Sequence, residues 1–90
     1  MVQVRPIGVL RLLDKGERDD KIIAVPVTGP MAEVSRMSEL DQLYPGVSEI
    51  ISEWFSAYKG PGKMQAQGYA DEVAALRMVQ LAADAYSEAQ

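Results

Sequence analysis

Two apolar runs near the start of the chain flank a short charged segment. The first run extends from Ile7 to Leu13 and the second from Ile22 to Val27, with Pro26 near its end. Between them, Leu12 to Lys21 holds four carboxylates and three cations, and Gly16 allows the chain to bend. Strand-like segments joined by a polar loop of this length predict a β-hairpin whose acidic side chains gather at one end.

The pattern within the two runs predicts how each strand is covered. Ile22 to Val25 is almost continuously apolar, which is typical of a strand buried on both faces. Gly8 interrupts the first run and predicts either a bulge or the close approach of another segment.

The clearest helical periodicity lies between Tyr44 and Lys59. Pro45 suits a first helical turn, and the Gly-Pro-Gly sequence at 60–62 predicts the end of the helix. An apolar and aromatic stripe follows one face, and burial in the core is favoured over a ligand cage because large aromatic side chains are usually buried. Its members are Ile50, Ile51, Trp54, Phe55 and Tyr58.

The remaining segments give weaker patterns. Met31 to Asp41 is predicted to be a loop that leads into a short helical turn over Ser38 to Leu43, with Ser38 and Asp41 as a capping box. Lys63 to Gly68 has little β-branched content and predicts a poor strand. Asp71 is the expected N-cap of a last helix that extends to about residue 87.

Length and composition narrow the possible functions. A chain of 90 residues predicts a single domain, 1–90, with a small core. The net charge of −4 argues against a nucleic-acid or anionic-membrane binder, and no apolar run reaches membrane-spanning length. The sequence has no cysteine and no signal-peptide pattern, which is consistent with the cytoplasm. Because it has no histidine, a metal here would be bound by oxygen, which favours magnesium, manganese or calcium.

The charged turn is the best candidate for chemistry. Carboxylates beside a lysine suit a hard cation that carries a phosphate, because the acids bind the metal and the ammonium binds the anion. A solvated loop with no further role is the alternative, since polar loop residues mostly serve to stay hydrated.

Two motifs resemble the soluble family I inorganic pyrophosphatases. The first is R-P-I-G-V-L starting at Arg5, followed by an acidic turn and by D-x-K leading into A-V-P. The second is W-F-S-A-Y-K starting at Trp54, followed by G-K at Gly62 and G-Y at Gly68. Both occur in the family's order and at about its spacing, and the resemblance covers nearly the whole chain.

The resemblance implies a fold and a set of roles. The fold would be α+β, part of an OB-like small β-barrel: a β-hairpin plus short strands, with two α-helices packed outside. Asp14 and Asp19 would bind Mg²⁺, Lys21 would contact phosphate, and Tyr58 and Lys59 would hold the leaving-side phosphate. The implied reaction is the hydrolysis of inorganic pyrophosphate to two phosphates, in which such groups bind the metal and donate to phosphate oxygens.

Other residues of the charged turn match no catalytic position of the family. Lys15, Glu17 and Arg18 are expected to face solvent, and Asp20 is interpreted as a bystander beside Asp19. The role of Lys63 stays open.

The sequence also departs from the family pattern. The central metal motif, of the form D-G-D-P-x-D, lies upstream of the first motif in the family and is absent here, as are a glutamate, a lysine and an arginine of the substrate site. The chain therefore resembles a C-terminal half. The segment from Lys59 to Gly68 is shorter than usual, its hydrophobic strand is replaced by K-M-Q-A-Q, and Tyr69 stands where the family usually has tryptophan.

Two functions follow from this comparison. The chain is either part of a magnesium-dependent pyrophosphatase whose N-terminal half is supplied separately, or a non-catalytic module that binds metal-phosphate weakly at most. Loss of an acid cluster that acts as a unit should remove most of the rate. Half of a barrel would leave open sheet edges, which predicts a homo-oligomer formed by exchange or edge pairing.

Overall fold

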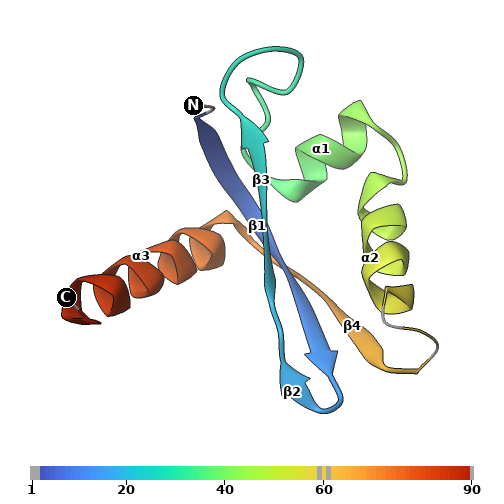
Figure 1. The fold of residues 1–90 in the computed structure, drawn as a ribbon. Helices are drawn as coiled ribbons and strands as arrows, with labels where there is room; N and C mark the ends of the chain where they lie inside the picture. Colours follow the sequence, from blue (N-terminus) through green and yellow to red (C-terminus); the bar gives the residue numbers. More distant parts are fainter. Residues whose placement is uncertain (1–2, 59, 61, 90) are drawn as a thin grey trace.

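The computed structural model describes residues 3–58, 60 and 62–89, and it confirms an α+β fold (Figure 1). Its elements in chain order are β1 (Val4–Asp14), β2 (Glu17–Arg18), β3 (Lys21–Pro26), α1 (Met37–Leu43), α2 (Val47–Ala57), β4 (Met64–Ala70) and α3 (Glu72–Ala89). All strand pairs are antiparallel and involve β1, which is the central strand. β2 and β3 pair with one edge of β1, and β4 pairs with the other.

The predicted hairpin is present, and its turn is tight. Lys15 and Gly16 have φ values of 54° and 85°, so both central residues adopt the left-handed conformation that favours a two-residue hairpin turn. Leu13 lies opposite Arg18, and the same register continues through the β1–β3 ladder. β2 and β3 are thus successive parts of one strand, interrupted at Asp19 and Asp20.

The segment predicted to be a poor strand does form a strand, β4. β4 pairs with β1 from Asp14 opposite Met64 to Val9 opposite Ala70, with a shift in register near Gly68. The partner strand and the buried Met64 side chain stabilise a strand that intrinsic β-propensity alone does not favour.

The pleat of β1 divides the sheet into two faces. Side chains alternate along a strand, so Leu10, Leu12 and Asp14 lie on one face, here called the α2 face, and Arg11 and Leu13 lie on the other, the α3 face. Figure 1 shows α1 and α2 on one side of the sheet and α3 on the other. Buried side chains fill the α2 face in two clusters: Ile7, Val25, Val34 and Leu40 near α1, and Leu10, Leu12 and Met64 near α2.

Gly8 is a point of close approach, as predicted. The register of β1 and β3 shifts between Pro6 and Gly8. A Cβ at Gly8 would lie 2.7 Å from Cγ of Met37 and 3.1 Å from the carbonyl oxygen of Ala70. The missing side chain therefore lets α1 pack directly on the sheet.

Arg5 fixes the long connection between β3 and α1. Its guanidinium donates hydrogen bonds to the carbonyl oxygens of Ala32 and Val34, at 2.8 and 2.7 Å. This connection lacks regular structure, so a side chain from the sheet supplies the hydrogen bonds that its backbone needs.

Several helical predictions need correction. Three helices pack on the sheet instead of two, and the sheet is open where the resemblance implied a barrel. Each strand other than β1 has one partner, so no pairing among the described strands closes the sheet. The expected helical turn is α1, but its N-cap is Arg36 and Ser38 caps nothing; instead Ser35 donates to the carboxylate of Glu39 through its N–H and its hydroxyl. Asp71 does cap α3, accepting a hydrogen bond from the N–H of Ala74.

The aromatic stripe of α2 and the covering of β3 also differ from expectation. Ile51 and Phe55 pack against the core, but Ile50, Trp54 and Tyr58 are exposed. Burial alternates along β3, where Ile22 is exposed, so β3 is an edge strand with incomplete cover. In the part of the chain that the structure describes, no further element covers these side chains. None of the described helices is both long and apolar enough to span a membrane.

Candidate functional site

The register of the hairpin brings Asp14, Asp19 and Lys21 to the same face. Asp19 lies opposite Leu12, and its N–H donates to the Leu12 carbonyl at 3.0 Å. Lys21 lies opposite Leu10. Because opposite residues in an antiparallel pair share a face, all three polar side chains belong to the α2 face.

A cavity of about 430 Å³ lies between this part of the hairpin and α2. Its lining consists of Asp19, Lys21, Trp54, Phe55, Tyr58 and Met64. The ammonium of Lys21 lies 2.9 Å from Oδ1 of Asp19, and both side chains are more than a third exposed. The cavity thus offers a carboxylate, an ammonium and a phenol to one ligand.

Aromatic contacts hold the phenol at this cavity. The rings of Trp54 and Tyr58 lie 5.3 Å apart and tilted, and Trp54 meets Phe55 edge to face at 4.9 Å. Phe55 is anchored in the core, so the three rings form a continuous aromatic surface from the core to the cavity. Tyr58 follows directly after α2, where its N–H still bonds to the Phe55 carbonyl.

Not every predicted residue meets at the cavity. Asp14 lies on the same face, opposite Met64, and one of its carboxylate oxygens is shielded from solvent, but it does not line the cavity. Lys59 falls outside the residues that the structure describes. Among described residues, no three acidic, histidine or cysteine side chains are placed to hold a metal ion together.

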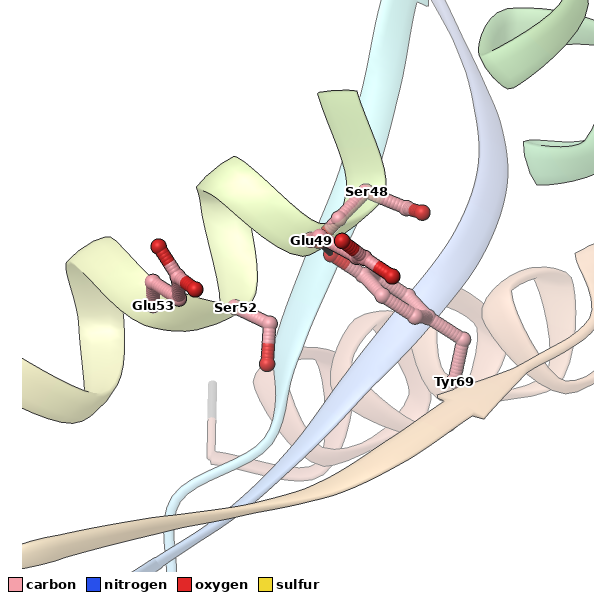
Figure 2. Close-up of a pocket in the computed structure, with 5 residues that line it drawn as sticks. All are labelled: Ser48, Glu49, Ser52, Glu53 and Tyr69. Atoms are coloured by element: carbon pink, nitrogen blue, oxygen red, sulfur yellow. Dashed lines mark hydrogen bonds between the residues drawn. The ribbon is translucent and has the colours of Figure 1, made fainter. Parts of the chain in front are cut away.

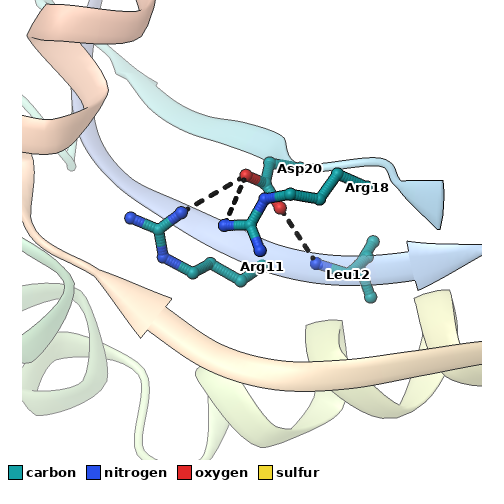
Figure 3. A network of polar contacts seen from close by, with 4 residues as sticks. All are labelled: Arg11, Leu12, Arg18 and Asp20. Carbon is teal, nitrogen blue, oxygen red and sulfur yellow. Dashed lines mark hydrogen bonds and ion pairs between the residues drawn. The ribbon is translucent and has the colours of Figure 1, made fainter. Parts of the chain in front are cut away.

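Asp20, interpreted as a bystander beside Asp19, has structural contacts of its own. Its carboxylate accepts a hydrogen bond from the N–H of Leu12 at 3.2 Å and lies 3.3 Å from Arg11 and 3.4 Å from Arg18 (Figure 3). The side chain is only 12% exposed. It replaces a backbone acceptor where the ladder is interrupted, and it pairs with Arg18, which was expected only to face solvent. The hairpin register, counted outward from the two-residue turn at Lys15 and Gly16, places Asp20 opposite Arg11. The sequence alone could therefore have indicated this ion pair.

A second hollow, at the start of α2, was also missed. Figure 2 shows Ser48, Glu49, Ser52, Glu53 and Tyr69 around it. The Tyr69 hydroxyl donates to the Ser48 carbonyl at 2.7 Å, and Ser48 donates through its N–H and its hydroxyl to Asp41 of α1. Gly46, the N-cap of α2, has no side chain, so Asp41 supplies the cap from a neighbouring helix.

These contacts shift two pKa values in this region. The hydroxyl and the N–H of Ser48 hold the pKa of Asp41 below its ordinary value of 3.8. Burial, and then the charge of Asp41, raises the pKa of Tyr69. Asp41, Ser48 and Tyr69 therefore connect α1, α2 and β4 as a structural unit.

A carboxylate, a lysine and a phenol around one cavity are the donor set that a metal-bound phosphate requires. Comparison with known proteins shows the family of the chain. The family described as inorganic pyrophosphatase matches residues 1–87, and the chain belongs to that family.

Individual relatives carry the same name. The inorganic pyrophosphatase of Drosophila melanogaster is 41% identical over 69 residues, covering 74% of this chain and 20% of the relative. That of Yarrowia lipolytica is 39% identical over 83 residues, covering 79% and 29%. That of Haloferax volcanii is 34% identical over 91 residues, covering 98% and 50%. The chain thus spans between a fifth and a half of these relatives.

Proposed function

We propose that this chain carries part of the site of a magnesium-dependent pyrophosphatase, which hydrolyses inorganic pyrophosphate to two phosphates. The observation that supports this proposal is the meeting of Asp19, Lys21 and Tyr58 at one cavity. Membership of the inorganic pyrophosphatase family gives the substrate class. The chain spans between a fifth and a half of the length of these relatives, so the proposal assigns it only part of the site.

The carboxylate oxygens at the cavity are ligands of the type that magnesium prefers. Magnesium prefers oxygen ligands and keeps several waters, so one or two carboxylates per ion are enough. Asp19 at the cavity and Asp14 on the same face would hold it. When bound, the ion would neutralise phosphate charge and activate water for hydrolysis.

The protein groups have complementary roles in binding. In the free chain, Asp19 and Lys21 neutralise one another. A ligand that brings both a cation and an anion can exchange this pair for two new contacts, with Asp19 facing the cation and Lys21 the phosphate. Tyr58, whose ring is fixed by Trp54, donates its hydroxyl to a phosphate oxygen.

Phosphate release from magnesium pyrophosphate tests this proposal. The 90-residue chain is assayed alone and beside Asp19→Ala and Lys21→Ala variants, with Arg77→Gln as a control for loss of charge on the distant helix α3. Release that both site variants abolish and the control retains supports the proposal. If release is absent, magnesium-dependent binding of a non-hydrolysable pyrophosphate analogue is measured; equal binding by all four proteins would refute the site.

A non-catalytic, self-associating module is the second candidate. Large apolar side chains stay exposed on α2 and α3, including Trp54, Val73 and Leu76, and β3 and β4 each have an outer edge with no partner among the described strands. Open edges and apolar surface favour pairing with another copy. Sedimentation equilibrium at high micromolar concentration measures this directly, and a monomer would exclude it.

A further inference from the structure

Several cationic side chains lie on the α3 face at the turn end of the hairpin. Leu13 lies opposite Arg18 on β2 and opposite Gln65 on β4, so these side chains share the face that Arg11 occupies. One residue past Asp14, the N–H of Lys15 donates to the carbonyl of Lys63 at 3.1 Å. The two lysines therefore come from neighbouring turns that are hydrogen-bonded to one another.

A hollow of about 180 Å³ lies between these two turns, and is here called the lysine hollow. It is lined by Leu13, Lys15, Gly16, Gly62, Lys63 and Gln65. This lining offers two ammonium groups and one amide, and contains no carboxylate. Lys15, Lys63 and Gln65 are exposed, so their polar ends can reach a ligand from solvent.

The backbone of the two turns leaves room for such a ligand. Gly16 and Gly62 have φ values of 85° and 74°, which glycine adopts without strain, and open space surrounds both Cα positions on the side where a Cβ would be. The two glycines therefore leave the rim of the lysine hollow open.

The pleat also places most carboxylates of the hairpin on the other face. Asp14 and Asp19 lie on the α2 face, as does Glu17, which is opposite Asp14. The one carboxylate of the hairpin that lies on the α3 face is Asp20, which two arginines already neutralise. The lysine hollow consequently keeps a positive local charge in a chain whose net charge is −4.

We propose that the lysine hollow binds the phosphate chain of a small anion, such as a linear polyphosphate or a nucleoside triphosphate, without a metal ion. Two ammonium groups and an amide match the oxygens of adjacent phosphates. The hollow is large enough for a short phosphate chain and too small for a folded macromolecule. It lies on the face of the sheet opposite Asp19 and Lys21, and does not depend on pyrophosphatase activity.

Calorimetric titration with tripolyphosphate in the presence of EDTA tests this proposal. Chelation removes divalent cations, so a ligand that reaches the carboxylates of the α2 face has no metal to offset their repulsion. The proteins compared are the 90-residue chain, Lys15→Gln/Lys63→Gln and Arg77→Gln. The first variant removes both ammonium groups of the hollow, and the second removes a positive charge on the distant helix α3.

The double variant should bind tripolyphosphate at least about tenfold more weakly, because charge-assisted hydrogen bonds to phosphate are lost. Arg77→Gln should stay within about twofold of the unmodified chain, since long-range charge is screened by salt. Unchanged affinity in the double variant, or an equal loss in both variants, would overturn the proposal. Circular dichroism confirms that the exposed substitutions leave the fold intact.

A second titration, with ATP, identifies the source of the phosphate chain. An affinity equal to that for tripolyphosphate assigns recognition to the phosphates alone, while loss of ATP binding restricts the hollow to free polyphosphate. Because these titrations contain no magnesium and measure no hydrolysis, they can fail or succeed independently of the pyrophosphatase proposal.

Discussion

Asp20 should contribute more to stability than any other acid of the hairpin, and Asp20→Ala tests this. Its carboxylate is the acceptor for the N–H of Leu12, a residue whose exposed fraction is 0%. Removing the acceptor leaves a donor of the central strand without its partner in a place that water does not readily reach. The same substitution also releases Arg11 and Arg18.

The free energy of unfolding should fall by about 2–3 kcal/mol. A buried donor that loses its acceptor costs about 1–3 kcal/mol. The two ion pairs involve Arg11 and Arg18, whose side chains are 38% and 56% exposed. Surface ion pairs contribute up to about 1 kcal/mol, and each of these should contribute near the low end of that range. For a domain of this size the total corresponds to a decrease in Tm of about 10–20 °C.

Urea denaturation followed by circular dichroism measures the effect, with two matched variants. Asp20→Asn keeps an oxygen for the Leu12 N–H and should lose about 1 kcal/mol, whereas Asp19→Ala removes only a partly exposed pair with Lys21 and should lose less than that. If Asp19→Ala destabilises the chain as much as Asp20→Ala, the assignment of structural and ligand-binding roles to these neighbouring residues is wrong.

Three further predictions test the packing and a polar contact between helices. Gly8→Ala should cost about 1–3 kcal/mol in thermal unfolding, because the new methyl group meets Met37, and adding Met37→Ala should recover part of this loss; no recovery would mean that the backbone contact dominates. Asp41→Asn should destabilise the chain at pH 7, and the difference should shrink on acidification: the pKa of Asp41 is lowered on folding, so its contribution is present above pH 3.8 and is lost as the pH falls through the folded value. Urea midpoints across this range check the sign, and a difference that grows on acidification would contradict it. Phe55→Ala should cost about 3 kcal/mol and Trp54→Ala less than 1 kcal/mol, because only Phe55 packs into the core; equal losses in calorimetry would argue against the exposed position of Trp54.

The elements that the sequence predicted well are those whose signals are local. The hairpin follows from two apolar runs and a turn containing Gly16, and α3 begins where Asp71 caps it. In both cases the deciding contacts join residues that are close in sequence, so a short segment contains the information. The family motifs likewise indicated which residues of the hairpin to consider.

Features that depend on distant partners were predicted less well. The poor strand expected over Lys63 to Gly68 forms β4, but its own polar sequence does not indicate that it pairs with β1. Helical periodicity correctly placed Trp54 and Phe55 together at one end of α2, but it could not show how far another layer covers that side. For the candidate site, the hairpin register explains why Asp19 and Lys21 meet, whereas their proximity to Tyr58 depends on how α2 packs across the sheet.

The length of the tight turn at Lys15 and Gly16 controls more than the direction of the chain. The turn fixes the register of the two strands, and this register places Asp19 and Lys21 on one face of the sheet and Arg18 and Asp20 on the other. Insertion of a single residue that slid β2 and β3 along β1 by one position would reverse this assignment. The hairpin should therefore resist changes in the length of its turn by an odd number of residues. A change of charge alters one contact, whereas a change of register exchanges the chemistry of the two faces.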